Sequence, residues 1–374
     1  MITKIKATVI GWYGTETIGD RAILAGIIRL LSEVASDITI ELGSLYPILS
    51  ERTLRDDGQF FEQCARQSSL KISLFDSQNR RELEHSICHS DVTIMGGGPL
   101  MDIEQMYTVE YAFSYAKRKK KKTILLGCGY GPLEKTETID CANRILNLAD
   151  LSIMRDTNAP HATATNLIDP AAFACLEFQQ NHPEEKTGDF YAINIRDITA
   201  AGGHYPTNND SDKYLIEWLQ RFVNEVDKPI QLVPMHTFSV GGDDRIILNR
   251  VAKEIHSPKV EILTFPPSLE ETMSIYRNAR LCIGMRFHAV LMQTILNGNN
   301  IILDYTDPKH GKIIELIRQL NIEDAYRERY LSVSQVHSDI TINPFKDMPY
   351  ELDMTRIEQY LDTYTKLIAH TLER

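Results

Sequence analysis

Short apolar runs alternate along this chain with longer segments in which apolar residues recur at helical spacing. The runs predict strands at residues 6–11, 39–42, 92–95, 123–127 and 151–154, and again at 190–195, 230–233, 260–263, 281–283 and 300–303. The longer segments predict helices at 20–32, 109–117, 212–226, 243–255 and 289–296. This alternation is typical of α/β proteins, in which helices cover both faces of a parallel sheet.

The pattern divides into two Rossmann-like halves and a terminal helix. The polar run QQNHPEEKTGD, at 179–189, has charge, Pro and Gly but no apolar period, which favours a linker. We therefore expect domains at 1–178 and 188–350, with a ligand cleft between them, and a packing helix in 351–374. Seven apolar residues define one face of that helix: Ile357, Tyr360, Leu361, Tyr364, Leu367, Ile368 and Leu372.

Composition narrows the class of protein. The 374 residues exceed what one hydrophobic core usually serves, and the formal net charge of -11 argues against a nucleic-acid-binding surface. The six cysteines lack metal-ligand spacing and are expected to be buried thiols in a reducing compartment. No signal-peptide pattern or apolar run of membrane-spanning length is present in the sequence, so we expect a cytoplasmic protein.

The most informative stretch is LCIGMRFHAVLMQTILNGNNIILDYTDPKHGK, at 281–312, which reads as strand, turn, helix, strand and a lysine-bearing loop. Arg286 and His288 follow the strand where a helix should begin. Ligands of open α/β sheets collect beyond the carboxyl ends of strands, and helix N-termini favour anions. The pattern therefore predicts a site for a small acidic ligand beside a titratable imidazole, against the alternative that His288 is a hydrogen-bonded core residue.

Glycine-rich turns follow two strands of the first half. Gly11, Gly14 and Gly19 lead into a helix that Asp20 would cap, but their spacing does not match the dinucleotide fingerprint. Gly14 and Asp20 could instead contact an acceptor. After the strand VTIM, the run that includes Gly97 and Gly98 could hold sugar hydroxyls or phosphate on its N–H groups, or form a sharp turn forced by packing.

Other polar residues also lie at strand ends. Arg196 ends YAINIR and His236 ends QLVPMH, so both would face the cleft; an ion pair for Arg196 and a plain hydrogen-bonded role for His236 are the alternatives. Arg155 could reach a ligand or tie the structure together by an ion pair. Lys309 could be a surface residue or an anion-binding one.

The run KRKKKK, at 117–122, is the one strong charge run in the sequence. Charge runs usually face water at a helix end. The alternative is contact with an anionic membrane surface or a lipid diphosphate.

Several short motifs occur in an order that resembles the polysaccharide pyruvyl transferase family. They are Gly11-Trp12-Tyr13-Gly14 before Gly19-Asp20, DVTIMGGG at 91–98, GCGYGP at 127–132, Arg155-Asp156, Asp169-Pro170, Arg286-Phe287-His288 and the loop from Asp304 to Lys309. Thr17 departs from the family pattern, which more often has Asn two residues before the Gly-Asp pair.

The resemblance implies a fold similar to GT-B glycosyltransferases, with the terminal helix packed back on the N-terminal domain. It implies transfer of the enolpyruvyl group of phosphoenolpyruvate onto two hydroxyls of a sugar, with release of phosphate and no cofactor. His288 would be the general acid beside Arg286. Lys309, Arg196, His236 and Arg155 would face the donor, and Gly14, Asp20, Gly97 and Gly98 the acceptor.

Further consequences concern partners and alternatives. The acceptor would be a sugar or lipid-linked oligosaccharide, which makes peripheral contact with the inner face of the membrane worth testing. We see no metal-ligand cluster, although Asp243-Asp244 leaves that question open. A nucleotide-sugar glycosyltransferase of the same architecture and a non-catalytic glycan- or phosphoester-binding protein are the alternatives.

Overall fold

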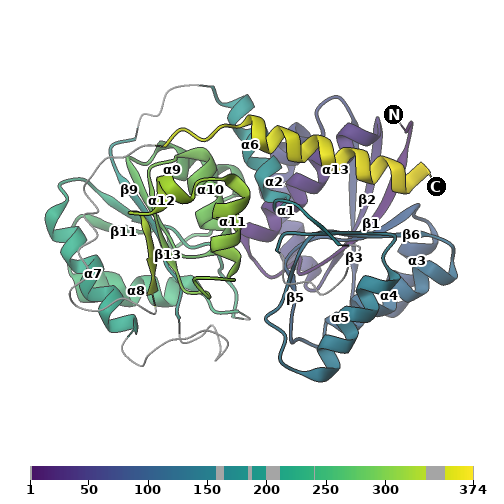
Figure 1. The fold of residues 1–374 in the computed structure, drawn as a ribbon, viewed down its shortest axis with the longest axis horizontal. Helices are drawn as coiled ribbons and strands as arrows, with labels where there is room; N and C mark the ends of the chain where they lie inside the picture. The colour runs from purple at the N-terminus through teal and green to yellow at the C-terminus, as the bar shows by residue number, and fades with distance from the viewer. Residues whose placement is uncertain are drawn as a thin grey trace. The chain divides into compact units, whose positions relative to one another are not determined.

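The computed structural model describes residues 2–156, 164–183, 188–198, 211–239, 241–333 and 350–373. The chain divides into two compact units (Figure 1). Unit 1 comprises Met1–Glu177 together with Met354–Arg374, and unit 2 comprises Phe178–Asp353. The C-terminal segment is therefore part of the N-terminal unit.

Unit 1 is built on a parallel sheet with the strand order β3-β2-β1-β4-β6-β7-β8, in which β5 also pairs with β6. Its strands are β1 (Ile5–Ile10), β2 (Asp37–Ser44), β3 (Ser69–Asp76), β4 (Val92–Met95), β5 (Pro99–Leu100), β6 (Lys122–Tyr130), β7 (Leu151–Met154) and β8 (Thr165–Asn166). Central strands β1, β4 and β6 are almost wholly buried, as expected when helices cover both faces.

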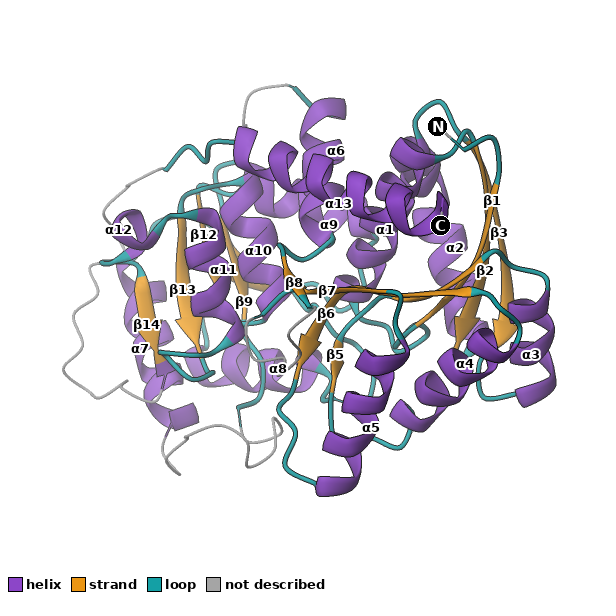
Figure 2. Ribbon diagram, turned by 45° about the vertical axis from the view of Figure 1, so that its right-hand side comes forward, coloured by secondary structure: helices purple, strands orange, loops and turns teal. Residues whose placement is uncertain are grey.

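Two groups of helices cover this sheet (Figure 2). The helices α3 (Arg80–Cys88), α4 (Met106–Arg118) and α5 (Thr136–Leu148) share one apolar cluster with the sheet. Another group contains α1 (Ile18–Val34), α2 (Pro47–Ala65) and α13 (Thr355–Glu373), in which α1 packs against both of the others. The remaining helix of the unit, α6 (Ala171–Asn181), runs across the unit boundary.

Unit 2 is a second parallel sheet, with the order β11-β10-β9-β12-β13-β14. Its strands are β9 (Tyr191–Asn194), β10 (Ile230–Leu232), β11 (Val260–Ile262), β12 (Leu281–Gly284), β13 (Asn300–Asp304) and β14 (Tyr330–Ser332). Its helices are α7 (Ser211–Glu225), α8 (Asp244–Ile255), α9 (Leu269–Asn278), α10 (Phe287–Leu296), α11 (Lys312–Leu320) and α12 (Glu323–Tyr326). Numbered from β9, this is the Rossmann order 3-2-1-4-5-6.

The strand order reverses at one point in each sheet, between β1 and β4 in unit 1 and between β9 and β12 in unit 2. The loops that leave these strands run in opposite directions and open a crevice at the carboxyl edge. Candidate ligand-binding residues are therefore expected in four loops. In unit 1 these are the loops after β1 and β4, and in unit 2 the loops after β9 and β12.

The predicted strands and helices are all present, with ends shifted by at most three residues. The pattern missed β3, whose alternating exposed and half-buried residues give no continuous apolar run. It also missed the short strands β5, β8 and β14. The first three residues of the predicted linker at 179–189 belong to α6 instead.

The C-terminal helix packs on α1, as predicted, and the apolar face of α13 carries Ile357, Leu361, Tyr364 and Ile368. The Tyr364 ring lies edge-on to Phe173, with 5.3 Å between centroids, and its hydroxyl donates to the Ile168 carbonyl at 2.7 Å. This bond spans almost two hundred residues of sequence and satisfies a buried carbonyl.

Tyr364→Phe removes that hydrogen bond and leaves the apolar ring in place. We expect the free energy of unfolding to fall by about 1 kcal/mol, measured by denaturant titration. Tyr107→Phe, at a tyrosine that is 44% exposed, is the matched control and should change little. Equal effects of the two substitutions would show that the Tyr364 hydroxyl does not hold α13 in place.

Candidate functional site

The switch point of unit 2 brings Arg196 and Arg286 to the same edge of the sheet. The Met285 N–H donates to the Asn194 carbonyl, and the Arg286 N–H donates to the Asn194 side chain at 3.1 Å. These bonds join the loop after β12 to the end of β9. Two cationic side chains thus leave neighbouring strands where an open α/β sheet usually binds its ligand.

Arg286 is held by Asp244, the first residue of α8. Its Nε lies 2.8 Å and 2.9 Å from the two carboxylate oxygens, and its Nη2 lies 2.6 Å from Oδ1. Asp244 is almost fully buried, whereas the Arg286 side chain is 16% exposed. Asp244 also accepts the N–H groups of Met235 and His236. The guanidinium is therefore fixed in orientation while one part of it stays accessible.

Arg196 and Lys312 lie against Tyr305, which follows β13. The Arg196 Nη1 donates to the Tyr305 hydroxyl at 3.2 Å, and its guanidinium carbon lies 4.9 Å from the ring centroid. The Lys312 ammonium lies 5.5 Å from the same centroid. Burial raises the pKa of Tyr305, but the charges of Lys312, Arg196 and Arg286 outweigh it and lower the value to about 7. Two cations therefore lie against this phenol, and the charge of a third acts on it.

His288 is half-buried in the first turn of α10, two residues after the N-cap residue Arg286. Its ring meets the Phe287 ring edge-on at 5.0 Å between centroids. The helix begins two residues before its predicted start, so the imidazole lies at a helix N-terminus, where anions are favoured.

Lys309 is exposed, and its backbone N–H donates to the Asp307 carboxylate at 2.7 Å in a turn. The lysine beside Tyr305 is instead Lys312, the first residue of α11. The sequence pattern singled out Lys309, whereas the lysine that shares the Tyr305 ring with Arg196 comes three residues later.

His236 is buried beneath the loop that leads into α8. Its ring Nε2 would lie 3.2 Å from a Cβ added at Gly241, and its backbone N–H donates to Asp244. His236 thus supports the segment that holds Arg286. Asp243 caps α8 through the Arg245 N–H and pairs with the Arg245 side chain.

The switch point of unit 1 is filled by aromatic rings. A Cβ added at Gly98 would lie 2.0 Å from the Trp12 ring, and one at Gly97 would lie 3.4 Å from Tyr13. Both glycines have positive φ, +112° at Gly97 and +73° at Gly98. The glycine run therefore makes room for Trp12 and Tyr13, which favours the packing role over a phosphate cradle.

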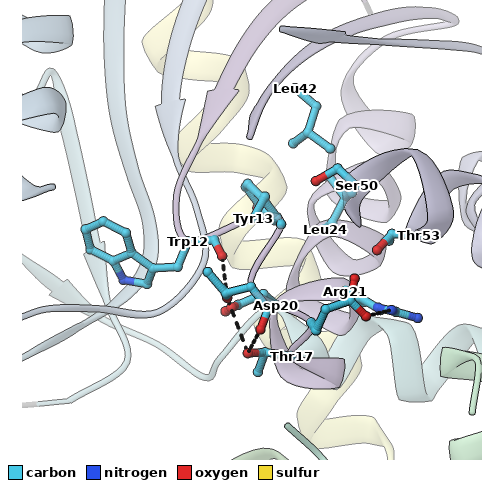
Figure 3. A pocket seen from close by; sticks show the side chains of 12 residues that line it. Trp12, Tyr13, Thr17, Asp20, Arg21, Leu24, Leu42, Ser50 and Thr53 are labelled. Atoms are coloured by element: carbon cyan, nitrogen blue, oxygen red, sulfur yellow. Dashed lines mark hydrogen bonds and ion pairs between the residues drawn. The ribbon is translucent and has the colours of Figure 1, made fainter. Parts of the chain in front are cut away.

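A small cavity lies beside the start of α1 (Figure 3). Its lining includes Gly14, Asp20, Thr53 and the aromatic Tyr13. Gly14 has φ +84°, and a Cβ there would lie 2.4 Å from the Ser44 hydroxyl, so this position requires glycine.

An ion network that sequence reasoning missed closes one side of this cavity. Arg21 lies 3.1 Å from Glu16 and 3.2 Å from Asp57, and all three side chains are at least 95% buried. Arg52 also pairs with Glu16. The members come from α1, α2 and the loop between β1 and α1, and no spacing in the sequence relates them.

Asp20 lies in the first turn of α1 and does not cap it, because the N-cap residue is Thr17, whose side chain forms no capping bond. The residue is 7% exposed. Burial raises its pKa to about 7; Arg155 opposes this shift and Asp169 adds to it. Arg155 itself is buried in a 2.6 Å ion pair with Asp169, so it ties β7 to the loop before α6.

Other expected features have these outcomes. Among the residues that the structure describes, no cluster of three His, Cys, Asp or Glu side chains is arranged to hold a metal ion. None of the described helices is both long enough and apolar enough to cross a bilayer.

The residues from Lys117 to Lys120 are exposed at the end of α4. The charged groups of Arg118 and Lys119 each lie 5.3 Å from the centroid of the Tyr115 ring.

Comparison with solved structures agrees with this fold. The chain is similar to the S. aureus MnaA–UDP complex, with 12% identity over 98% of each chain and a TM-score of 0.51. It is also similar to a Listeria monocytogenes protein assigned as a UDP-N-acetylglucosamine 2-epimerase, with 11% identity over 93% of this chain and 94% of that one and a TM-score of 0.50. A search of curated proteins found no match.

The fold is α/β, with two Rossmann-like domains of the GT-B type, as predicted. The family model described as polysaccharide pyruvyl transferase matches residues 18–308, so the chain belongs to that family. It is therefore a transferase that acts in the pyruvylation of polysaccharides, and its acceptor is a sugar or a polysaccharide.

The Asp20 carboxyl gives a prediction about pH. Its pKa in the folded state is raised, so the stability it contributes is full below the unfolded value of about 3.9 and is lost as the pH rises through about 7. Asp20→Asn removes this dependence. The free energy of unfolding of the variant minus that of the wild type should increase by about 2 kcal/mol between about pH 5 and about pH 8.

Denaturant titrations at several pH values measure this difference. Asp227→Asn, at an exposed carboxylate, is the control and should show a nearly constant difference. A constant difference for Asp20→Asn as well would mean that Asp20 ionises normally in the folded protein.

Proposed function

We propose that this protein transfers the enolpyruvyl group of phosphoenolpyruvate to two hydroxyls of one sugar, forming a cyclic pyruvate ketal and releasing phosphate. The observation that carries the proposal is the group of Arg196, Arg286 and Lys312 at the carboxyl edge of the unit 2 sheet. In a member of this family, such an edge suits a small donor with two anionic ends.

The donor carries a carboxylate and a phosphate, both attached to its C2 carbon. The guanidinium groups of Arg196 and Arg286 offer planar forks for such anions, and the N-terminus of α10 adds N–H groups and a favourable dipole. We assign the third cation to Lys312 instead of Lys309, because the Lys312 ammonium lies beside Tyr305 while Lys309 is exposed. His236 supports this site through the loop to α8 and is not assigned a direct contact.

His288 is our candidate general acid. Its proton passes to C3 of the donor, the C3 methylene becomes a methyl group, and C2 becomes electrophilic. One sugar hydroxyl adds to C2 and its proton restores the imidazolium. The C2–O bond to phosphate then breaks, the second hydroxyl adds, and its proton leaves with phosphate. A general acid of this kind typically contributes about 10²–10⁴-fold, and the cations stabilise the departing phosphate.

We assign the acceptor to unit 1, with Gly14 and Asp20 at its cavity. The lining offers a carboxyl group and several hydroxyls, which are the groups that hydrogen-bond sugar hydroxyls. Gly97 and Gly98 shape this region by making room for Trp12 and Tyr13. Arg155 contributes by holding Asp169 near Asp20.

Phosphate release tests the proposal. Purified protein with phosphoenolpyruvate and a panel of pyranosides should release phosphate with one or a few acceptors, and the product should be heavier by the pyruvate ketal in mass spectrometry. Release of a nucleoside diphosphate from a nucleotide sugar would identify a glycosyltransferase instead. Binding of both ligands without turnover would identify a binding protein.

Substitutions at the cationic edge of unit 2 distinguish the general acid from the residues that bind the donor. His288→Ala should lower kcat by at least about 10²-fold with donor binding retained, because it removes only the acid. Arg286→Ala and Lys312→Met should each raise the KM for phosphoenolpyruvate by about tenfold, the loss of one charge-assisted contact. Lys309→Met is the matched control and should stay near wild type.

Steady-state kinetics with the identified acceptor measures these effects. A wild-type rate for His288→Ala would remove it as the acid. A KM raised by Lys309→Met and unchanged by Lys312→Met would return the cation role to the residue predicted from the sequence.

Contact with the inner face of a membrane is a further part of the proposal. The exposed run Lys117 to Lys120 stands out in a chain whose net charge is -11, and cations near an anionic surface contribute about 1 kcal/mol each. Replacing Lys119, Lys120 and Lys121 by Gln should reduce cosedimentation with anionic vesicles severalfold, with neutral vesicles as the control. Unchanged cosedimentation would leave the run a solvated helix end.

A further inference from the structure

Tyr305 stands apart from the residues assigned so far, because it is a buried phenol placed among cations. The residue is 4% exposed and directly follows β13. Arg196, from the loop after β9, and Lys312, from the start of α11, lie against its ring. The charge of Arg286, from the loop after β12, also acts on the phenol. A buried phenol surrounded in this way is in the environment that stabilises its anionic form.

Two carboxylates of this edge, Asp244 and Asp304, have partners of their own. Asp244 pairs with Arg286 through both of its oxygens. Asp304 accepts the Thr306 N–H and hydroxyl on one oxygen and the Tyr330 hydroxyl on the other, while Lys312 lies close enough to act on its charge. The cations Arg196 and Lys312 both meet the Tyr305 ring, and Arg196 donates to its hydroxyl.

We propose that Tyr305 is a positioning residue: its phenolate is the counter-charge that orients Arg196 and Lys312, and donor binding returns a proton from solvent to its hydroxyl. The inference rests on the proposed function. When an anionic donor binds the same cations, they no longer favour the phenolate, so the phenol takes up one proton and becomes a hydrogen-bond donor toward the anion. No other bond forms or breaks in this step.

The effect of the neighbouring charges on the pKa of Tyr305 agrees with its role as a counter-charge. The three cations outweigh burial and bring the pKa of Tyr305 to about 7, whereas an ordinary tyrosine has a pKa of about 10. Tyr330, one strand away, has the opposite environment: burial and the adjacent Asp304 carboxylate raise its pKa far above the ordinary value. Tyr330→Phe is therefore a matched control for Tyr305→Phe.

Ultraviolet difference spectroscopy of the full chain tests the first half of the inference. Between about pH 6 and about pH 8, the wild type and Tyr330→Phe should show the phenolate band of one tyrosine, and Tyr305→Phe should lack it. Saturating phosphoenolpyruvate should reduce the band in the wild type. This last measurement needs no variant, so it decides the question even if Tyr305→Phe does not fold. A wild type without the band in this range would overturn the proposal.

Calorimetry of phosphoenolpyruvate binding in buffers of different ionisation enthalpy tests the second half. The wild type should take up protons on binding, Tyr305→Phe should take up about half a proton fewer at about pH 7, and its KM should rise by about tenfold with a smaller change in kcat. Equal proton uptake by the two proteins would overturn the role of Tyr305 and leave the proposed function standing. No binding by the wild type would overturn both the proposed function and the role of Tyr305, whether or not the phenolate band is present.

Discussion

The buried carboxylate of Asp244 joins the parts on which the cationic edge of unit 2, our proposed donor site, depends. It accepts the N–H groups of Met235 and His236 at the end of β10, and it grips the guanidinium of Arg286 beyond β12. Strand β9 lies between those two strands in the sheet. One side chain therefore spans the edge of the sheet and fixes the direction in which Arg286 points. An arginine held in this way retains its charge and loses its freedom, which lowers the cost of ordering it around a ligand.

The two units use the same topology differently. In unit 2 the loops at the switch point carry arginines that meet a lysine and a phenol. In unit 1 the corresponding loops carry Trp12 and Tyr13, which pack against glycines, and the charges near them are paired in buried networks such as Arg21 with Glu16 and Asp57. The difference supports a division of labour in which unit 2 takes the anionic donor and unit 1 takes the neutral, hydroxyl-rich acceptor.

The sequence allowed much of the fold to be predicted, because the strands next to the switch points are continuous apolar runs. Arg286, His288 and Arg196 could be placed because each directly follows such a run. Lys312 and Asp244 were not recognised as site residues, since their proximity to Tyr305 and Arg286 depends on where α11 and α8 begin. The network of Arg21 and Asp57 joins side chains 36 positions apart, and no periodicity reports such a contact. The interpretation of Asp20 as a helix cap fails for a local reason, because α1 begins at Ile18, two residues before the predicted start.

The central claim is that the cationic edge of unit 2 binds phosphoenolpyruvate. A crystal structure of the protein grown with phosphoenolpyruvate, or with a non-reactive analogue that keeps both anionic ends, tests it directly. The account predicts donor density beyond β9 and β12, with its oxygens within hydrogen-bond distance of Arg196 and Arg286 and its C3 carbon next to His288. Donor density in the cavity of unit 1, with this edge unchanged, would contradict it.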